Sequence, residues 1–345
     1  MKLITRNALR KLITRNNLRK LIKIILIAAF LFVIFGIILI FVSPYCHSVV
    51  IKTKDYIYIL RNNEARVSKY LGDDENVIIP DSFLGKPITS VEDLCFDGNE
   101  TIESVEIPDT VKNIRFRAFS SCPNLASVKA NNIVLVEHAA FADDKNLKHV
   151  DLGTHLETIE EYAFEYCESL EYIPSRESLK SIGTMAFAWS GITKVGDLTG
   201  VNIESEDIFQ GTPWMDNQTG EYVTIGDVLI EYKGESDISV IPEGVKTIGD
   251  AYDIYPKRNI SVYIPSTTTR IASYALLVSE CYTLYIPKSV NSIIDNDDVY
   301  CLDYDLEEGG SCKIVTVSGS YAEQYAIDHG IDYEIVNGWE VPEEE

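Results

Sequence analysis

The histidines and acidic residues of this sequence lack the spacing that catalysis or metal binding requires. The sequence contains no GxxxxGK[ST], HExxH or GxSxG motif. Acidic runs at residues 73–75, 143–144 and 295–298 lack the ligand spacing of a calcium loop, and we interpret them as solvated turns. The five histidines are scattered, at His47, His138, His149, His155 and His329. We therefore expect no catalytic residue, no cofactor and no metal, and predict that the protein is not an enzyme.

The seven cysteines do not indicate a zinc site, because no two of them have CxxC spacing. Cys301 and Cys312 flank an apparent turn at residues 307–310. In an extracellular, oxidising setting these two could form a disulfide, and the alternative is a pair of thiols.

Two tyrosines have a type and spacing suited to ligand contact. Tyr263 and Tyr285 are 22 residues apart, and each stands two residues before a proline. Tyrosine offers flat, amphipathic contact area, which protein and sugar interfaces favour. Whether the two rings can act together depends on the elements that carry them.

Those elements belong to an internal repeat. Alanine or cysteine precedes most of a series of phenylalanines that recur every 22 or 23 residues, and an aliphatic residue stands five positions before all but the last of them. The series consists of Phe96, Phe119, Phe141, Phe164, Phe187 and Phe209. A second, degenerate series carries Ile-Pro at residues 241–242, 264–265 and 286–287. A fixed period of this length is typical of repeat architectures.

Each repeat predicts one coil of a solenoid. The alternation of polar and apolar residues at 104–107 predicts a strand with one buried face, and Pro108 ends it. We expect the segment around each phenylalanine to form a short helical turn. One coil cannot bury its own apolar face, so the coils must stack, about 4.8 Å apart. We thus predict a mainly β solenoid of 22–23-residue coils with parallel strands and a buried phenylalanine ladder. Its strand wall should contain Val105, Val128, Val150 and Ile173.

The repeat register also places the cysteines and tyrosines. Cys122 and Cys167 share one slot two coils apart, about 9–10 Å, which is beyond disulfide reach and predicts two small buried residues. Tyr263 and Tyr285 fill one outward slot in successive coils, after Val240. We interpret the two tyrosines as a ligand patch, and the alternative is a purely structural cross-strand pair. In the first block the same slot holds a mixed row without a coherent site: Glu106, Lys129, Asp151 and Pro174.

These repeats resemble a known family. The segments IPDTVKNIRFRAFSSCPNL at 107–125 and LETIEEYAFEYCESL at 156–170 resemble the BspA-type leucine-rich repeat of bacterial surface proteins. Residues 70–91 and 319–336 resemble the lead-in and closing coil of such arrays, so the resemblance extends over about residues 51–336. It implies a curved parallel-strand solenoid, exposed on a cell surface and involved in adhesion or protein binding. The sequence departs from the pattern at 126–134, 196–208 and 250–312.

The N-terminus predicts a membrane anchor. Residues 24–42 are 19 consecutive apolar residues, which as a helix span roughly 28 Å, near the thickness of the hydrocarbon core. A cleaved signal peptide is the alternative, but its apolar stretch is usually shorter, and Tyr45 makes a poor cleavage site. Eight basic residues precede the run, which favours a cytoplasmic N-terminus and an extracellular repeat domain.

Charge limits the partners of the extracellular part. Beyond residue 43 the chain carries 22 basic and 53 acidic residues, a formal charge of −31. Such a surface repels nucleic acid and anionic lipid, so we exclude both as ligands of the main body.

The predicted organisation follows from these features. It consists of a basic cytoplasmic segment (1–23), a transmembrane helix (24–42), a short linker (43–50), an N-terminal cap with the first repeat block (51–214), a hairpin insert (215–236), a second, degenerate block with the C-terminal cap (237–336) and an acidic tail (337–345). We predict a single-pass cell-membrane protein that binds an extracellular protein or glycan. The alternative is a structural scaffold of a cell-envelope assembly without a soluble ligand.

Overall fold

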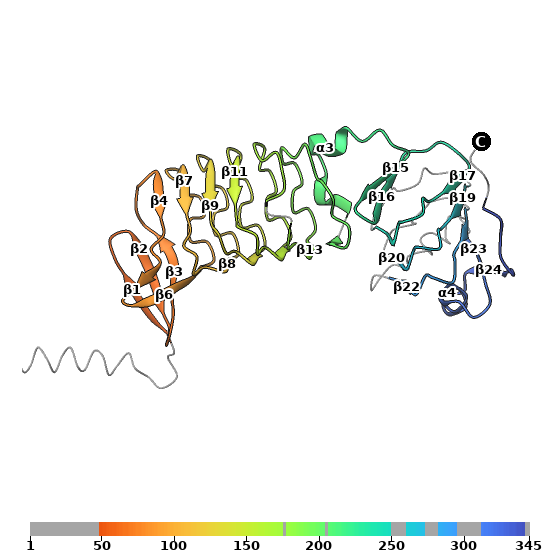
Figure 1. Cartoon of the computed structure of the whole chain (residues 1–345), viewed down its shortest axis with the longest axis horizontal. Coiled ribbons are helices and arrows are strands. Elements are labelled where there is room, and N and C mark those ends of the chain that lie inside the picture. Colours follow the sequence, from red (N-terminus) through yellow and green to blue (C-terminus); the bar gives the residue numbers. More distant parts are fainter. Residues whose placement is uncertain are drawn as a thin grey trace, which may run out of the picture.

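The computed structural model describes residues 48–174, 177–203, 206–249, 260–272, 282–294 and 312–341. The predicted basic segment, the predicted transmembrane helix and Cys301 lie outside these residues. Within them, none of the helices has the length and apolar character needed to cross a membrane. The described part is an elongated stack, with a cap at one end and two repeat blocks in succession (Figure 1).

The N-terminal cap is an antiparallel meander that merges with the first coil. It contains β1 (Val49–Lys52), β2 (Tyr56–Leu60), β3 (Ala65–Tyr70) and a hairpin of β5 (Ser82–Phe83) with β6 (Lys86–Val91). Strand β6 pairs in parallel with β3, which turns the meander into the stack. The ring of Tyr70 stacks on Phe96 at 5.0 Å between centroids, so the cap closes the end of the core.

Two parallel ladders form the walls of the first block. One ladder contains the strands that precede the Ile-Pro position of each repeat, here called the Ile-Pro strands even where other residues occupy that position: β4 (Asn76–Ile78), β7 (Ser104–Glu106), β9 (Ser127–Lys129) and β11 (His149–Asp151). The opposite ladder continues from β6 through β8 (Asn113–Ile114), β10 (Leu135–Val136), β12 (Thr158–Ile159), β13 (Ser181–Ile182) and β14 (Asn202–Ile203). The predicted strand wall is confirmed, because Val105, Val128, Val150 and Ile173 are all buried.

The predicted phenylalanine ladder is also confirmed. Consecutive rings from Phe96 to Phe209 stack almost parallel, with centroids between 4.8 and 5.6 Å apart. This spacing matches the separation of paired strands, so one ring fits each coil. All six side chains are fully buried.

The segments around the first five phenylalanines are turns with two left-handed residues each, so the prediction of a helical turn is wrong for these coils. In five coils the residue two positions before the phenylalanine has a positive φ: Leu94, Arg117, Ala139, Tyr162 and Met185. The residue two positions after the ring is also left-handed: Gly98, Ser121, Asp143, Tyr166, Trp189 and Gly211. This geometry directs backbone N–H groups along the stack, as when Ser121 donates to the Ala142 carbonyl at 2.8 Å. Of these segments, only Glu206–Phe209 is helical, as the 3-10 helix η1.

The slot three residues after the phenylalanine is a buried polar column. Cys122 and Cys167 are fully buried, as predicted, and donate Sγ–H to the carbonyls of Phe96 and Phe141 at 3.3 and 3.2 Å. Between them lies the buried carboxyl group of Asp144, whose Oδ1 accepts from the Cys122 N–H at 2.7 Å.

A short helix follows the first block, and a hairpin begins the second, because its strand β16 (Val228–Tyr232) pairs with β18 (Thr247–Ile248). Helix α3 (Pro213–Asp216) begins at the N-cap Thr212, whose side chain accepts from the Met215 N–H. Strands β15 (Tyr222–Ile225) and β16 (Val228–Tyr232) then form the predicted hairpin, which turns at residues 226–227.

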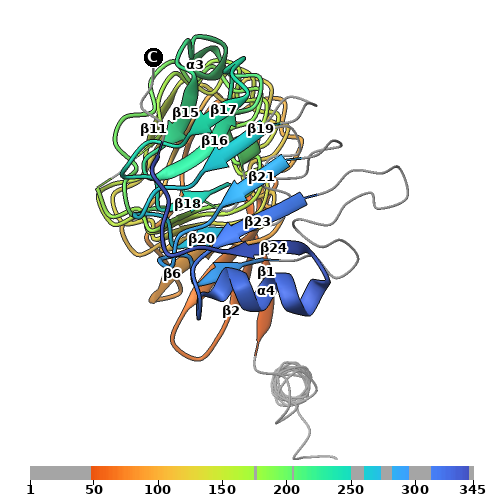
Figure 2. The same ribbon diagram turned by 90° about the vertical axis from the view of Figure 1, so that its right-hand side faces the viewer.

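The second block has its own core and two five-stranded ladders. One contains β15, β16, β18 (Thr247–Ile248), β20 (Arg270–Ile271) and β22 (Ser292–Ile293). The other contains β17 (Ile238–Val240), β19 (Ile260–Tyr263), β21 (Tyr282–Tyr285), β23 (Cys312–Thr316) and β24 (Asp332–Ile335), and Figure 2 shows it side by side with helix α4 (Tyr321–His329). Gly330 ends this helix in the left-handed conformation.

Candidate binding face on the Ile-Pro strands

The outward side of the Ile-Pro strands is the candidate functional surface in both blocks. In each strand of the first ladder the central residue points into the core, so its two neighbours face outward. Glu106, Lys129 and Asp151 are exposed, as the register predicts, but Pro174 is buried. The regular ladder ends at β11, and the next coil contributes only the isolated bridge between Tyr172 and Lys194. The predicted row therefore stops at Asp151.

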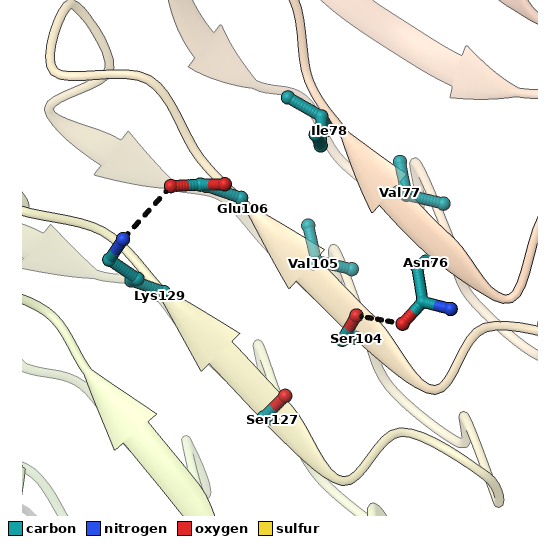
Figure 3. Close-up of a pocket in the computed structure, with 8 residues that line it drawn as sticks. All are labelled: Asn76, Val77, Ile78, Ser104, Val105, Glu106, Ser127 and Lys129. Carbon is teal, nitrogen blue, oxygen red and sulfur yellow. Dashed lines mark hydrogen bonds and ion pairs between the residues drawn. The ribbon is translucent and has the colours of Figure 1, made fainter.

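A shallow hollow of about 320 Å³ lies on the first ladder. Strands β4, β7 and β9 form it, and Figure 3 shows its lining side chains side by side: Asn76, Val77, Ile78, Ser104, Val105, Glu106, Ser127 and Lys129. Ile78 is 71% exposed at its rim. This site was not predicted, because the predicted outward row began at Glu106. The same Ile-Pro signal stands at Ile79-Pro80, and it places Ile78 in the outward slot of that coil.

The polar groups of the hollow are arranged in two rows. Ser104 donates to Asn76 Oδ1 at 2.6 Å, and Ser127 lies beside Ser104 on the next strand. In the second row, Lys129 Nζ lies 3.0 Å from Glu106 Oε1, and this hydrogen bond raises the pKa of Lys129. Such a surface can offer hydroxyl and amide contacts beside one ion pair, which suits an extended chain or a glycan.

The structure places Tyr263 and Tyr285 next to each other on the second Ile-Pro ladder. Val240, Tyr263 and Tyr285 are directly paired across β17, β19 and β21, as the repeat register predicts. The two rings are stacked, with centroids 4.1 Å apart and planes inclined by 7°. Partial burial, followed by a hydrogen bond with Tyr285, raises the pKa of Tyr263 to about 12. The Tyr263 hydroxyl is therefore a neutral, hydrogen-bonding group at physiological pH.

The chain itself covers part of this tyrosine pair. Trp339 follows β24, and its ring lies 5.8 Å from that of Tyr285, at an angle of 59°. Residues 337–345 were predicted only as an acidic tail, so this contact is a new feature. Both tyrosines are half-buried rather than fully exposed, and Trp339 contacts Tyr285 of the pair.

The two blocks share one surface chemistry. Ser261 and Thr283 form a hydroxyl row beside the tyrosines, as Ser104 and Ser127 do in the first block. Lys313 follows Thr283 in the hydroxyl row of the second block, and its Nζ lies 2.6 Å from Glu334 Oε2, so this block also carries an exposed ion pair.

The remaining predicted groups do not converge. Cys301 lies outside the described residues, so its disulfide with Cys312 stays a prediction. His138 packs between Phe116 and Tyr162 in the turns, far along the coil from the exposed strand residue His149. Across the described ranges, no group of three or more His, Cys, Asp or Glu side chains could hold a metal ion.

Comparison with known protein families agrees with this geometry. The family described as "BspA type Leucine rich repeat region" matches residues 75–212 and 223–301, in six copies. The chain belongs to the BspA-type leucine-rich repeat family. The matched residues of this BspA-type protein include both hydroxyl rows and Tyr263 and Tyr285.

Solved structures of several bacterial leucine-rich repeat proteins are similar to this BspA-type chain. A leucine rich cell surface protein from Faecalibacterium prausnitzii A2-165 is 20% identical, with a TM-score of 0.42 over 81% of this chain and 97% of that one. The T. pallidum leucine rich repeat protein is 16% identical (TM-score 0.30; 84% and 99% covered), and the pneumococcal vaccine antigen PcpA is 14% identical (TM-score 0.38; 84% and 99% covered). A search of curated proteins found no match. The family assignment rests on the repeat match alone.

Proposed function

We propose that this protein is a membrane-anchored, extracellular binding module whose Ile-Pro strand face contacts a protein or a glycan. The observation that carries the proposal is the stacked, half-buried pair Tyr263 and Tyr285 on that face. Aromatic rings with a hydroxyl group combine apolar contact area with hydrogen bonding, and they are enriched at the centres of interfaces. The hydroxyl rows beside the pair would add hydrogen bonds to a ligand lying across several coils.

The membrane anchor in this proposal is the apolar run at residues 24–42. Protease added to intact cells or protoplasts should remove the repeat domain and leave a small membrane-bound stub. Complete protection of the repeats would contradict the topology. A free protein beginning near residue 46 would instead indicate a cleaved signal peptide.

Binding is tested with the full-length chain in lipid nanodiscs, offered to a glycan array and to purified cell-surface proteins. A saturable interaction with one class of ligand is the expected result. The alternative function, a scaffold of an envelope assembly, predicts stable co-purification with envelope components from the native membrane and no saturable binding to a soluble ligand.

A further inference from the structure

One end of the N-terminal cap brings together a strand start and two turns. Strand β1 begins at Val49, which pairs with Leu60 at the end of β2. Lys86, at the start of β6, donates to the Arg61 carbonyl in the β2–β3 turn at 2.6 Å. The β5–β6 turn and the β2–β3 turn therefore lie beside the start of β1. We call this end the cap tip and define it by Val49, Val50, Arg61, Leu84 and Lys86.

The cap tip exposes large apolar side chains. Val49 is 45%, Val50 65% and Leu84 69% exposed. Leu84 and Gly85 form the two-residue turn between β5 and β6, and Leu84 has a φ of 51°. Such turns favour asparagine or glycine at this position, because a side chain is strained there. A strained leucine that contributes little to the core indicates that its side chain contacts a partner other than this part of the chain.

The charge of the cap differs from that of the rest of the extracellular part. Residues 49–70 contain five basic and two acidic residues, whereas the part beyond residue 43 has a formal charge of −31. Arg61 is exposed at the tip. Among the acidic residues of this region, Glu64 forms an ion pair with Arg66, at 2.7 Å. A negatively charged bilayer repels the body of the protein but not this end.

The short segment between the apolar run and strand β1 limits the distance between the cap tip and the membrane. Strand β1 begins seven residues after the apolar run ends at Val42. Seven extended residues span at most about 25 Å. The headgroup layer itself occupies roughly 5–8 Å beyond the hydrocarbon core. If residues 24–42 cross the membrane, the cap tip stays within a short distance of the lipid surface.

We propose that the cap tip contacts the bilayer surface, with Val50 and Leu84 at the boundary between headgroups and acyl chains and Arg61 at the lipid phosphates. This proposal rests on the proposed membrane anchor. In this arrangement the N-terminal end of the solenoid faces the bilayer. The ladder that carries Tyr263 and Tyr285 lies at the opposite end of the stack, away from the membrane (Figure 1).

The test places a fluorescent reporter at the tip of the full-length protein. Leu84→Trp is reconstituted at one chain per nanodisc, in phosphatidylcholine with phosphatidylglycerol, and quenched with lipids brominated near the headgroup end of the acyl chains. The matched control is Tyr172→Trp, at an exposed position in the middle of the stack. The parent protein, with Trp189, Trp214 and Trp339, provides the background signal.

The expected result is a blue-shifted emission and a loss of the added fluorescence for Leu84→Trp, with neither effect for Tyr172→Trp. Adding Arg61→Glu should weaken the quenching more in discs that contain phosphatidylglycerol than in pure phosphatidylcholine. Equal, unquenched emission from both variants, with the chain retained in the disc, would overturn the tip contact and leave the anchor intact. Loss of the chain from the disc would refute the anchor and the tip contact together. Shielding that needs several chains per disc would assign the tip to a second copy instead.

Discussion

The rings of Tyr263 and Tyr285 lie face to face on neighbouring strands, with centroids 4.1 Å apart and planes inclined by 7°. A stack of this kind stabilises the sheet by about 0.2–1 kcal/mol, so it has structural value of its own. It also fixes both rings before a ligand arrives, which lowers the entropic cost of binding. The contact of Trp339 with Tyr285 adds a segment that a large ligand would have to displace.

Phe164→Ala should destabilise the protein by about 3–5 kcal/mol, because it leaves a cavity in the ladder. The ring is fully buried between Phe141 and Phe187, at 5.1 and 5.3 Å. The control is Glu165→Ala at the next, half-buried position, with an expected change within about 0.5 kcal/mol. Urea unfolding measures both, and equal shifts would show that the ladder is not the core.

The parent protein should lose stability as the pH rises, and Asp144→Asn should remove this loss. Burial raises the pKa of Asp144 well above its usual value, and Oδ2 has no hydrogen-bond partner among the described residues. The folded state therefore keeps a proton that the unfolded state releases above about pH 4. Stability must fall as pH rises from there towards the folded-state pKa, by about 1.4 kcal/mol for each unit of the shift.

Urea unfolding at pH 5 and pH 8 measures this effect. We subtract the free energy of unfolding of the parent from that of Asp144→Asn at each pH. This difference should be larger at pH 8 than at pH 5. Asp143→Asn, at the exposed neighbouring position, controls for the general charge of the protein. An identical pH dependence in all three proteins would mean that Asp144 does not hold a proton in the folded state.

Gly211→Ala and Trp189→Ala should show coupled effects on stability. A Cβ atom at Gly211 would lie 2.4 Å from Cδ1 of Trp189, and Gly211 also has a φ of 66°. The first substitution should cost about 1–2 kcal/mol for its backbone strain and more for the clash. Removing the indole relieves only the clash, so the double variant should be more stable than the sum of the two single effects predicts. Additive effects would show that the indole does not pack on Gly211.

The sequence predicted the features of the fold that repeat with an apolar pattern. The spacing of Phe164 and its equivalents gave the ladder, and the alternation around Val128 gave the strand wall, because both patterns follow from burial. The left-handed turns at residues such as Tyr162 were not predictable in this way, since most of these positions lack the glycine or asparagine that marks a positive φ. Their conformation comes from hydrogen bonds to the next coil.

The candidate site was predictable only in part. Register alone placed Tyr263 beside Tyr285, because stacking brings equivalent slots of neighbouring coils together. The contact of Trp339 was not predictable, since it follows the closing coil and belongs to no repeat. The exposure of Ile78 was predictable, since Ile78 precedes Ile79-Pro80 and occupies the same outward slot as Glu106.

The most direct test of the binding face is the affinity of the double variant Tyr263→Ala/Tyr285→Ala. The full-length parent and variant are compared in nanodiscs against the ligand selected from the array, with folding checked by circular dichroism and thermal unfolding. Tyr172→Ala, on the strand face of the first block, is the matched control. We predict at least a tenfold loss of affinity for the folded double variant, equivalent to about 1.4 kcal/mol, and none for the control. A double variant that folds and binds as well as the parent would contradict the account and leave the tyrosine pair with a structural role.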